Sequence, residues 1–194
     1  MKKTKKPGWI VLVIFAVLIV VADQITKYLT VKNIPFGADV PVLENILHLT
    51  YVQNEGAAFS MLSGMRWLFV LLVVIYGVAI FFCIKKGIFG KPFELWCLAA
   101  ISGGAVGNMI DRIASGSVTD MIVLKFLYIP MLSFKGGFRV TLTPFAVFNV
   151  ADIFITCGVI ALAVYILFFG REKKKAEGEE ASAEAEETDD ETAQ

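Results

Sequence analysis

The stretch "LWCLAAISGGAVGNMIDRIASGSVTDMI", residues 95–122, joins a long apolar run to charged side chains. Residues 95–110 carry no charge, and Asp111, Arg112 and Asp120 follow them. A run of this kind is typical of a helix in a lipid bilayer, where ionisable groups are costly and usually have a function. The stretch therefore predicts a membrane-spanning helix with a polar site at one end.

Three further apolar segments accompany this one. The four are residues 9–22, continuing past Asp23; 67–84; 95–110; and 145–169. A bilayer core takes about 20 helical residues, and flanking polar residues supply the missing length of the shorter segments. With 57% apolar residues and a mean hydropathy of +0.70, the chain is too apolar for an ordinary soluble domain. We therefore expect a membrane all-α bundle of four transmembrane helices over residues 1–170.

Basic residues are concentrated on one side of these spans. Eleven of the eighteen lie before the first span, between the second and third, or after the fourth. They are Lys2, Lys3, Lys5, Lys6, Lys85, Lys86, Lys91, Arg171, Lys173, Lys174 and Lys175. Short basic segments next to spans stay on the cytoplasmic side. Both termini are therefore predicted to be cytoplasmic, and the connections 28–66 and 112–144 to face outward.

The basic start and the apolar run 9–22 also resemble a cleavable signal peptide, with a weak cleavage site at Val20-Val21-Ala22. Its removal would leave three spans and unbalance the remaining basic clusters. We therefore expect the first span to be retained.

Both outward connections contain patterns that favour β-structure. The segment "ILHLTYV", residues 46–52, alternates in polarity, and "FKGGFRVTLTPF", residues 134–145, has the form of a Gly-Gly turn between short strands. Small extracytoplasmic β elements are therefore expected at the outer end of the bundle.

The C-terminal segment 171–194 holds ten of the eighteen acidic residues and almost no large apolar side chain. Such a composition cannot bury enough surface to offset the entropy of ordering the chain. We expect a disordered, acidic cytoplasmic tail without chemistry of its own.

Metal and thiol chemistry find little support. Cys83, Cys97 and Cys157 each lie in an apolar stretch without metal-ligand spacing, and His48 is the one histidine in the chain. We expect no metal, no organic cofactor, no Cys–His nucleophile and no nucleic-acid partner.

Four acidic residues outside the tail fall at one predicted depth, near the outer face of the membrane. They are Asp23, Asp111, Asp120 and Asp152. They outnumber the nearby cations, Lys27 and Arg112, so two carboxyls in a poorly hydrated site would share one proton. Of such a pair, the ionised member can take a proton from water while the protonated member donates to a carbonyl. This pattern indicates aspartic-protease chemistry on a peptide presented at the membrane surface.

Helical spacing groups these polar residues. Asp23 and Lys27 lie four residues apart and can pair, and the pattern Asn-x-x-Asp occurs at both 108–111 and 149–152. On a helix, each Asn-x-x-Asp would set an amide beside a carboxyl. Three glycines upstream allow another helix to approach closely. They are Gly103, Gly104 and Gly107.

Three other roles for the polar residues stay open. Ion pairs can simply lock helices together, and this role suits Asp23, Lys27 and Arg112 best. A small proton-coupled transporter or channel subunit would instead carry acids at several depths. A non-catalytic assembly factor would tolerate Asp→Asn at Asp120 and Asp152 together.

Five motifs occur in a fixed order along the chain. They are "DQITK" (23–27), "NEGAAF" (54–59), "GGAVGNMIDR" (103–112), "VTDMI" (118–122) and "FNVAD" (148–152). Together they resemble the sequence blocks of the lipoprotein signal peptidase (signal peptidase II) family, over about residues 9–170. The resemblance implies an aspartic endopeptidase of the bacterial cytoplasmic membrane that needs no cofactor. It would cut prolipoproteins at the outer face, just before a cysteine that carries diacylglycerol.

The resemblance also implies roles for individual residues. The family's catalytic pair falls on Asp120 and Asp152. Supporting and substrate-contacting positions fall on Asp23, Lys27, Asn54, Gly56, Asn108, Asp111, Arg112 and Asn149. Spacing alone favours Asp111 as the partner of Asp152, whereas the resemblance makes Asp111 a supporting residue that Arg112 keeps ionised.

The sequence departs from the family pattern in two places. The connection between Asp120 and Asp152 is longer than the family pattern, and Glu55 stands where a small or hydroxylated residue is expected. The first difference bears on how a substrate would be covered and not on the chemistry.

Overall fold

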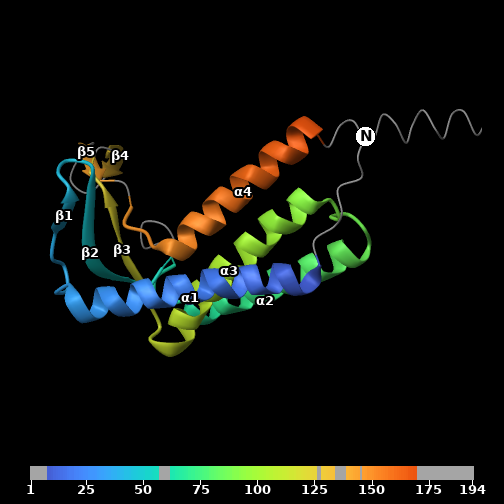
Figure 1. Cartoon of the computed structure of the whole chain (residues 1–194). Helices are drawn as coiled ribbons and strands as arrows, with labels where there is room; N and C mark the ends of the chain where they lie inside the picture. Colours follow the sequence, from blue (N-terminus) through green and yellow to red (C-terminus); the bar gives the residue numbers. More distant parts are fainter. Residues whose placement is uncertain (1–7, 57–61, 126–127, 134–138, 145, 170–194) are drawn as a thin grey trace, which may run out of the picture.

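The fold is built on four long helices (Figure 1). The computed structural model describes residues 8–56, 62–125, 128–133, 139–144 and 146–169. The helices are α1 (Trp9–Asn33), α2 (Arg66–Lys85), α3 (Pro92–Ala114) and α4 (Val150–Phe169). Each is long and apolar enough to cross a bilayer. The prediction of a four-helix membrane bundle is confirmed, and the predicted acidic tail lies outside the described residues.

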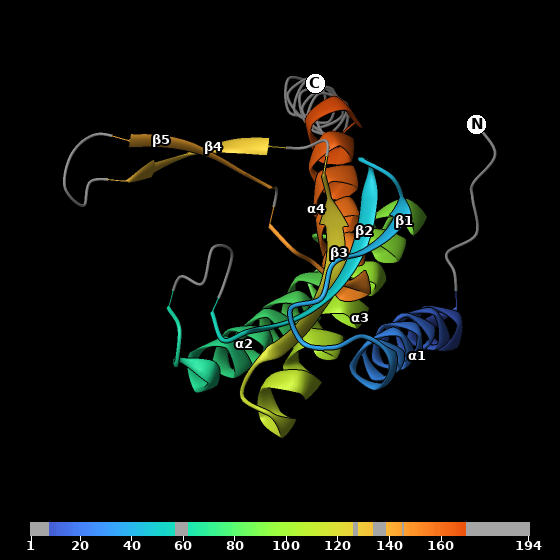
Figure 2. The same ribbon diagram turned by 90° about the vertical axis from the view of Figure 1, so that its left-hand side faces the viewer.

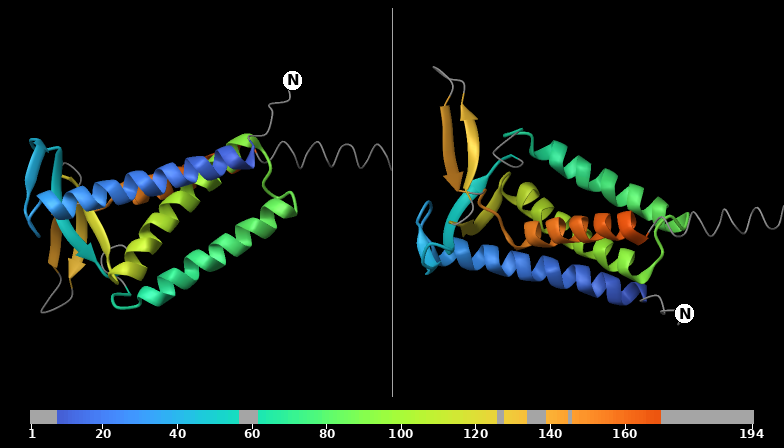
Figure 3. Two further views of the ribbon diagram at one scale, coloured as in Figure 1. Left: turned by 60° about the horizontal axis from the view of Figure 1, so that its bottom comes forward. Right: turned by 90° about the horizontal axis from the view of Figure 1, so that it is seen from above.

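Helix α3 holds the bundle together because it packs against α1, α2 and α4 (Figure 3). Its glycines make this possible, as predicted. A Cβ atom on Gly103 would lie 2.8 Å from the carbonyl oxygen of Ala16 on α1, and one on Gly104 would lie 2.5 Å from that of Ala151 on α4. Small residues of this kind let helix backbones approach closely in membranes.

The substitution Gly104→Ala is expected to lower the free energy of unfolding by about 1–3 kcal/mol, because the added methyl group must push α3 and α4 apart. Gly77→Ala on α2 is the matched control, since no atom lies within 4 Å of the added methyl group. Unfolding in detergent micelles, followed by circular dichroism, measures both variants. Equal stability of the two would contradict the role given to Gly104.

An antiparallel sheet in the order β1-β2-β3 caps one end of the bundle, which we call the sheet end (Figure 1). Its strands are β1 (Val40–Leu43), β2 (Leu47–Asn54) and β3 (Val118–Leu124). The predicted strand 46–52 coincides with most of β2. The C-termini of α1 and α3 and the N-termini of α2 and α4 meet at this end, so loop residues and helix ends converge there.

A second antiparallel pair, β4 (Tyr128–Ser133) and β5 (Arg139–Pro144), stands apart from the sheet (Figure 2). It accounts for the two short strands predicted in the long connection. The predicted Gly-Gly turn lies outside the described residues.

Backbone hydrogen bonds tie β3 to the segment before α4. The carbonyl oxygen of Phe148 accepts from the N–H groups of Met121 (3.0 Å) and Ile122 (2.8 Å), and the N–H of Phe148 donates to Ile122 (3.1 Å). These bonds fix the strand that carries Asp120 against the start of the helix that carries Asp152.

The fourth apolar segment becomes helical only from Val150, because Asn149 caps the helix. The N–H of Asp152 donates to Asn149 Oδ1 (3.0 Å), and the N–H of Asn149 donates to Asp152 Oδ2 (3.2 Å). This reciprocal pair is a capping box. The expectation that both Asn-x-x-Asp patterns lie within helices is therefore wrong for the second, which is the signal that starts α4.

Candidate active site

Asn149 lies at the centre of the polar cluster at the sheet end and contacts both candidate acids. Its Nδ2 donates to Asp120 Oδ1 (2.7 Å) and to Asn108 Oδ1 (3.1 Å), and its backbone N–H donates to Asp152. The side chain of Asn149 is fully buried. One residue thus links a carboxyl from β3 with a carboxyl from α4.

Two further amides orient the carboxyls. Asn54 Nδ2 donates to Asp120 Oδ2 (3.1 Å), and Asn108 Nδ2 donates to Asp152 Oδ1 (2.7 Å). The N–H of Gly56 donates to Asn54 Oδ1 (3.1 Å) and so fixes the amide of Asn54. All four carboxyl oxygens accept a neutral hydrogen bond, whereas neither acid forms an ion pair with a side chain that the structure describes.

The environment of Asp120 favours its protonated form. Its side chain is buried at the base of the sheet, with 3% of the residue exposed. Burial, followed by the nearby charge of Asp152, raises the pKa of Asp120 to about 6. Two neighbouring carboxyls in such a site hold a shared proton near neutral pH.

Lys27 forms the second part of the cluster. Its Nζ lies 2.8 Å from Asp23 Oδ2, 2.9 Å from Asp111 Oδ2 and 2.9 Å from Asn108 Oδ1. An ammonium group has three donors, and each meets one acceptor. The predicted pairing of Asp23 with Lys27 is confirmed, and this buried cation also reaches α3.

Asp23 and Asp111 are used to hold elements together. Asp23 Oδ1 accepts the N–H of Ala151 in the first turn of α4 (2.9 Å), and Asp111 Oδ2 accepts the N–H of Thr119 in β3 (3.1 Å). Gln24 Nε2 donates to Asp111 Oδ1 (2.9 Å). Sequence reasoning missed Gln24, although its signal is present as a polar residue beside Asp23 in an apolar run.

Arg112 does not keep Asp111 ionised, contrary to the expectation from the sequence. Lys27 pairs with Asp111, while Arg112 Nη2 donates to the carbonyl oxygen of Gly56 (2.9 Å) and the guanidinium carbon lies 4.5 Å from the ring centre of Phe69. Consecutive residues on a helix point about 100° apart. Asp111 therefore faces α1 and Arg112 faces α2.

A cavity of about 240 Å³ adjoins these residues between α2, α3 and α4. Asn108 and Arg112 lie in its wall, together with apolar and aromatic side chains such as Phe69 and Ile155. The Nε atom of Arg112 is buried and has no hydrogen-bond partner among the described residues.

The remaining candidates take no part in this network. Glu55 is exposed, and its Oε2 accepts a hydrogen bond from Ser63 (3.1 Å). The three cysteines are unpaired thiols. Within the described residues, no group of histidine, cysteine and acidic side chains could hold a metal ion.

Comparisons with known proteins point to one family. The family model described as signal peptidase (SPase) II matches residues 15–168. A lipoprotein signal peptidase of Caldanaerobacter subterraneus subsp. tengcongensis is 39% identical over 159 residues, covering 81% of this chain and 97% of the relative. Another, from Geobacillus kaustophilus, is 38% identical over 162 residues, covering 82% and 94%.

The fold agrees with the sequence. A bacterial membrane enzyme solved at 2.3 Å resolution superposes with a TM-score of 0.69 at 29% identity, covering 84% of this chain and 91% of that chain. A second structure described as a bacterial membrane enzyme, at 1.9 Å, gives the same score with 85% and 97% coverage. The matched residues contain the whole polar cluster and all but the first turns of the bundle, and the chain therefore belongs to the signal peptidase II family of membrane aspartic peptidases.

Proposed function

We propose that this chain removes signal peptides from prolipoproteins and cuts just before a cysteine that carries diacylglycerol, with Asp120 and Asp152 as the catalytic pair. One observation carries the proposal: two neighbouring carboxyls are oriented by amides and have no ion-pair partner among the described residues. Asp111, the pair that spacing favours, is already neutralised by Lys27 at 2.9 Å.

The pair would work as a general acid and a general base around one water molecule. The ionised carboxyl takes a proton from water while the protonated carboxyl donates its proton to the scissile carbonyl oxygen. The resulting tetrahedral intermediate breaks its C–N bond, and the leaving amine receives a proton from the pair. The peptide gains one water in total, and the pair regains its single shared proton.

Arg112 and Asn108 are suited to hold the peptide at this pair. Both line the cavity between α2, α3 and α4, and Arg112 has a donor there that no described residue uses. An unsatisfied buried donor is costly unless a ligand completes it. A carbonyl group of the bound peptide would provide that acceptor.

Charge distribution favours a site at the outer face of the bacterial cytoplasmic membrane. The basic clusters flank the helix ends opposite the sheet end, which makes both termini cytoplasmic. A lipid-anchored cysteine would then meet the acids at the surface of the bilayer. A proton-coupled transporter, the alternative, needs acids at several depths, whereas these acids share one end of the bundle.

Purified protein in liposomes, mixed with a diacylglyceryl-modified precursor and with its unmodified counterpart, tests the proposal. We expect cleavage of the modified precursor alone, seen as a shift on a gel. Cleavage of neither precursor, together with proton flux that the substitution Asp152→Asn removes, would instead support the transporter.

The rate of cleavage is expected to depend on pH with a single maximum. Below the maximum the pair takes up a second proton and loses its base, and above it the pair loses the shared proton and its acid. Because the pKa of Asp120 is raised to about 6, the alkaline limb should begin near that pH and not near the ordinary range of aspartic acid. Measurement of kcat/KM across pH checks this, and a rate that is constant from acid to alkaline pH would contradict it.

A further inference from the structure

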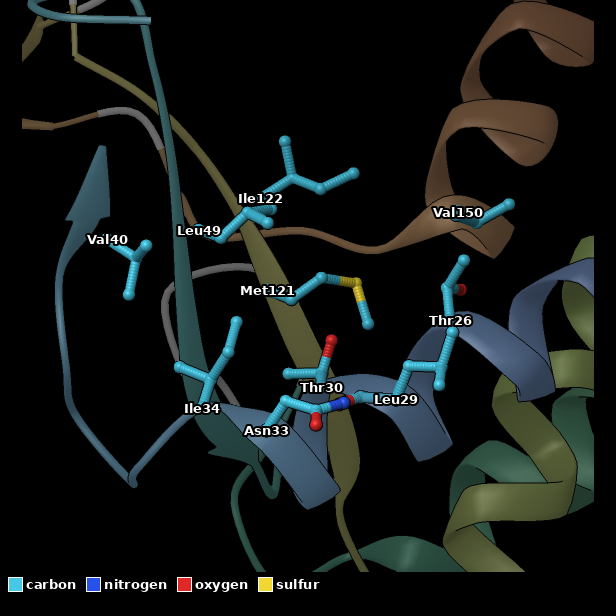
Figure 4. Close-up of a pocket in the computed structure, with 10 residues that line it drawn as sticks. All are labelled: Thr26, Leu29, Thr30, Asn33, Ile34, Val40, Leu49, Met121, Ile122 and Val150. Atoms are coloured by element: carbon cyan, nitrogen blue, oxygen red, sulfur yellow. The ribbon is translucent and has the colours of Figure 1, made fainter. Parts of the chain in front are cut away.

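A second cavity, of about 470 Å³, lies at the sheet end beside α1 (Figure 4). We call it the rear pocket. Its wall includes Leu29 and Ile34 at the end of α1, Leu49 from β2, Met121 and Ile122 from β3, and Val150 from α4. Its volume is within the range of ligand sites in proteins.

The lining of the rear pocket suits hydrocarbon and not a polar group. Most of its side chains are apolar. Two of its polar side chains are already used by their own helix: the hydroxyl of Thr26 lies 3.0 Å from the carbonyl oxygen of Ala22, and Asn33 Nδ2 donates to that of Leu29 (2.7 Å). An occupant therefore gains by burying apolar surface.

The rear pocket lies behind the two acids. Asp120 and Met121 are consecutive in β3, so they point to opposite faces of the sheet. Figure 4 shows Met121 extending from β3 toward α1. On α4, Val150 and Asp152 are two residues apart, about 200° around the helix. Residues in the wall of the pocket thus face away from the carboxyls, so a peptide bond at the acids would not occupy it.

The surroundings of the rear pocket determine its occupant. Leu29 and Val40 line it and remain 48% and 40% exposed, and Ile25, one turn before Leu29 on α1, is 53% exposed. These residues continue the apolar surface of a helix long enough to span a membrane, where the surrounding medium is lipid. We propose that the rear pocket holds one acyl chain of a bilayer phospholipid, separate from the lipid on the substrate.

Photolabelling tests this proposal without any need for cleavage. The full chain is placed in phosphatidylcholine vesicles that contain a phospholipid with a diazirine on one acyl chain, irradiated, digested and analysed by mass spectrometry. We expect adducts on peptides that contain Leu49 or Met121. Leu49→Trp, which fills the pocket, should lose them, and Ile25→Trp, the same residue type on the lipid-facing side of α1, should keep them.

Further arms separate the other outcomes. Ile34→Trp fills the pocket from α1 and replaces Leu49→Trp if that variant does not fold. The inactive Asp152→Asn variant should be labelled as strongly as the unchanged chain, so failure of the proposed function leaves this test intact. Equal labelling of filled and control variants would overturn the proposal. Displacement of the label by excess diacylglyceryl-modified precursor would also overturn it, because the pocket would then belong to the substrate.

Discussion

Replacement of Asp152 by Asn is expected to lower kcat for a lipidated prolipoprotein by about 10⁴-fold. Asparagine keeps the size of the side chain but cannot carry the proton between water and the peptide. Asp120→Asn should have the same effect, because neither carboxyl works without the other. Both variants should still insert and fold, since neither acid forms an ion pair with a described residue that the substitution would break.

Asp39→Asn provides the matched control. Asp39 also lies at the sheet end, but it is exposed and pairs with His48 and Lys125 (2.7 and 2.9 Å). This variant should cleave at the rate of the unchanged chain in the same gel-shift assay. Near-normal turnover by either Asp120→Asn or Asp152→Asn would rule out the proposed pair. Asp111→Asn should impair activity less, through lower stability.

The substitution Lys27→Met is expected to lower the free energy of unfolding by about 3–5 kcal/mol. It removes the one described cation that contacts both Asp23 and Asp111, and two buried carboxylates would then face each other without compensation. It also leaves Asn108 Oδ1 without the hydrogen bond from Lys27. Loss of this cluster should loosen α1 from α3, which is visible as a lower unfolding temperature in detergent micelles.

Lys125→Met is the control for this prediction. It removes the same kind of side chain from an exposed pair with Asp39, and exposed pairs contribute little to stability. The triple variant Lys27→Met, Asp23→Asn, Asp111→Asn should recover part of the loss, because the buried charges disappear together. If Lys27→Met unfolds at the same temperature as Lys125→Met, the cluster does not stabilise the bundle.

Local sequence signals were enough to predict the four spans and the strand 46–52. Apolar runs of sufficient length have few alternatives in a membrane, and alternation at period two is equally local. The start of α4 differed from its apolar segment because Asn149 and Asp152 close a capping box, although both residues are visible in the sequence. There the capping signal determines the helix boundary and the hydropathy does not.

The composition of the site was harder to predict because it depends on contacts between distant segments. Spacing placed Asp111 with Asp152, but the bonds between Phe148 and β3 bring Asp120 to α4 instead. No periodicity reveals that contact; the family resemblance did. The partner of Asp111 was wrong for a similar reason: Lys27 reaches it from another helix, whereas Arg112 is only its neighbour in sequence.

The double use of Asn149 has a consequence for biogenesis. The same residue begins α4 and bridges the two carboxyls, so the acids cannot be aligned until the last span has formed and docked. A nascent chain with three spans in the bilayer is therefore inert. Newly made enzyme gains proteolytic competence only when synthesis is nearly finished, which protects neighbouring membrane proteins from a half-assembled protease.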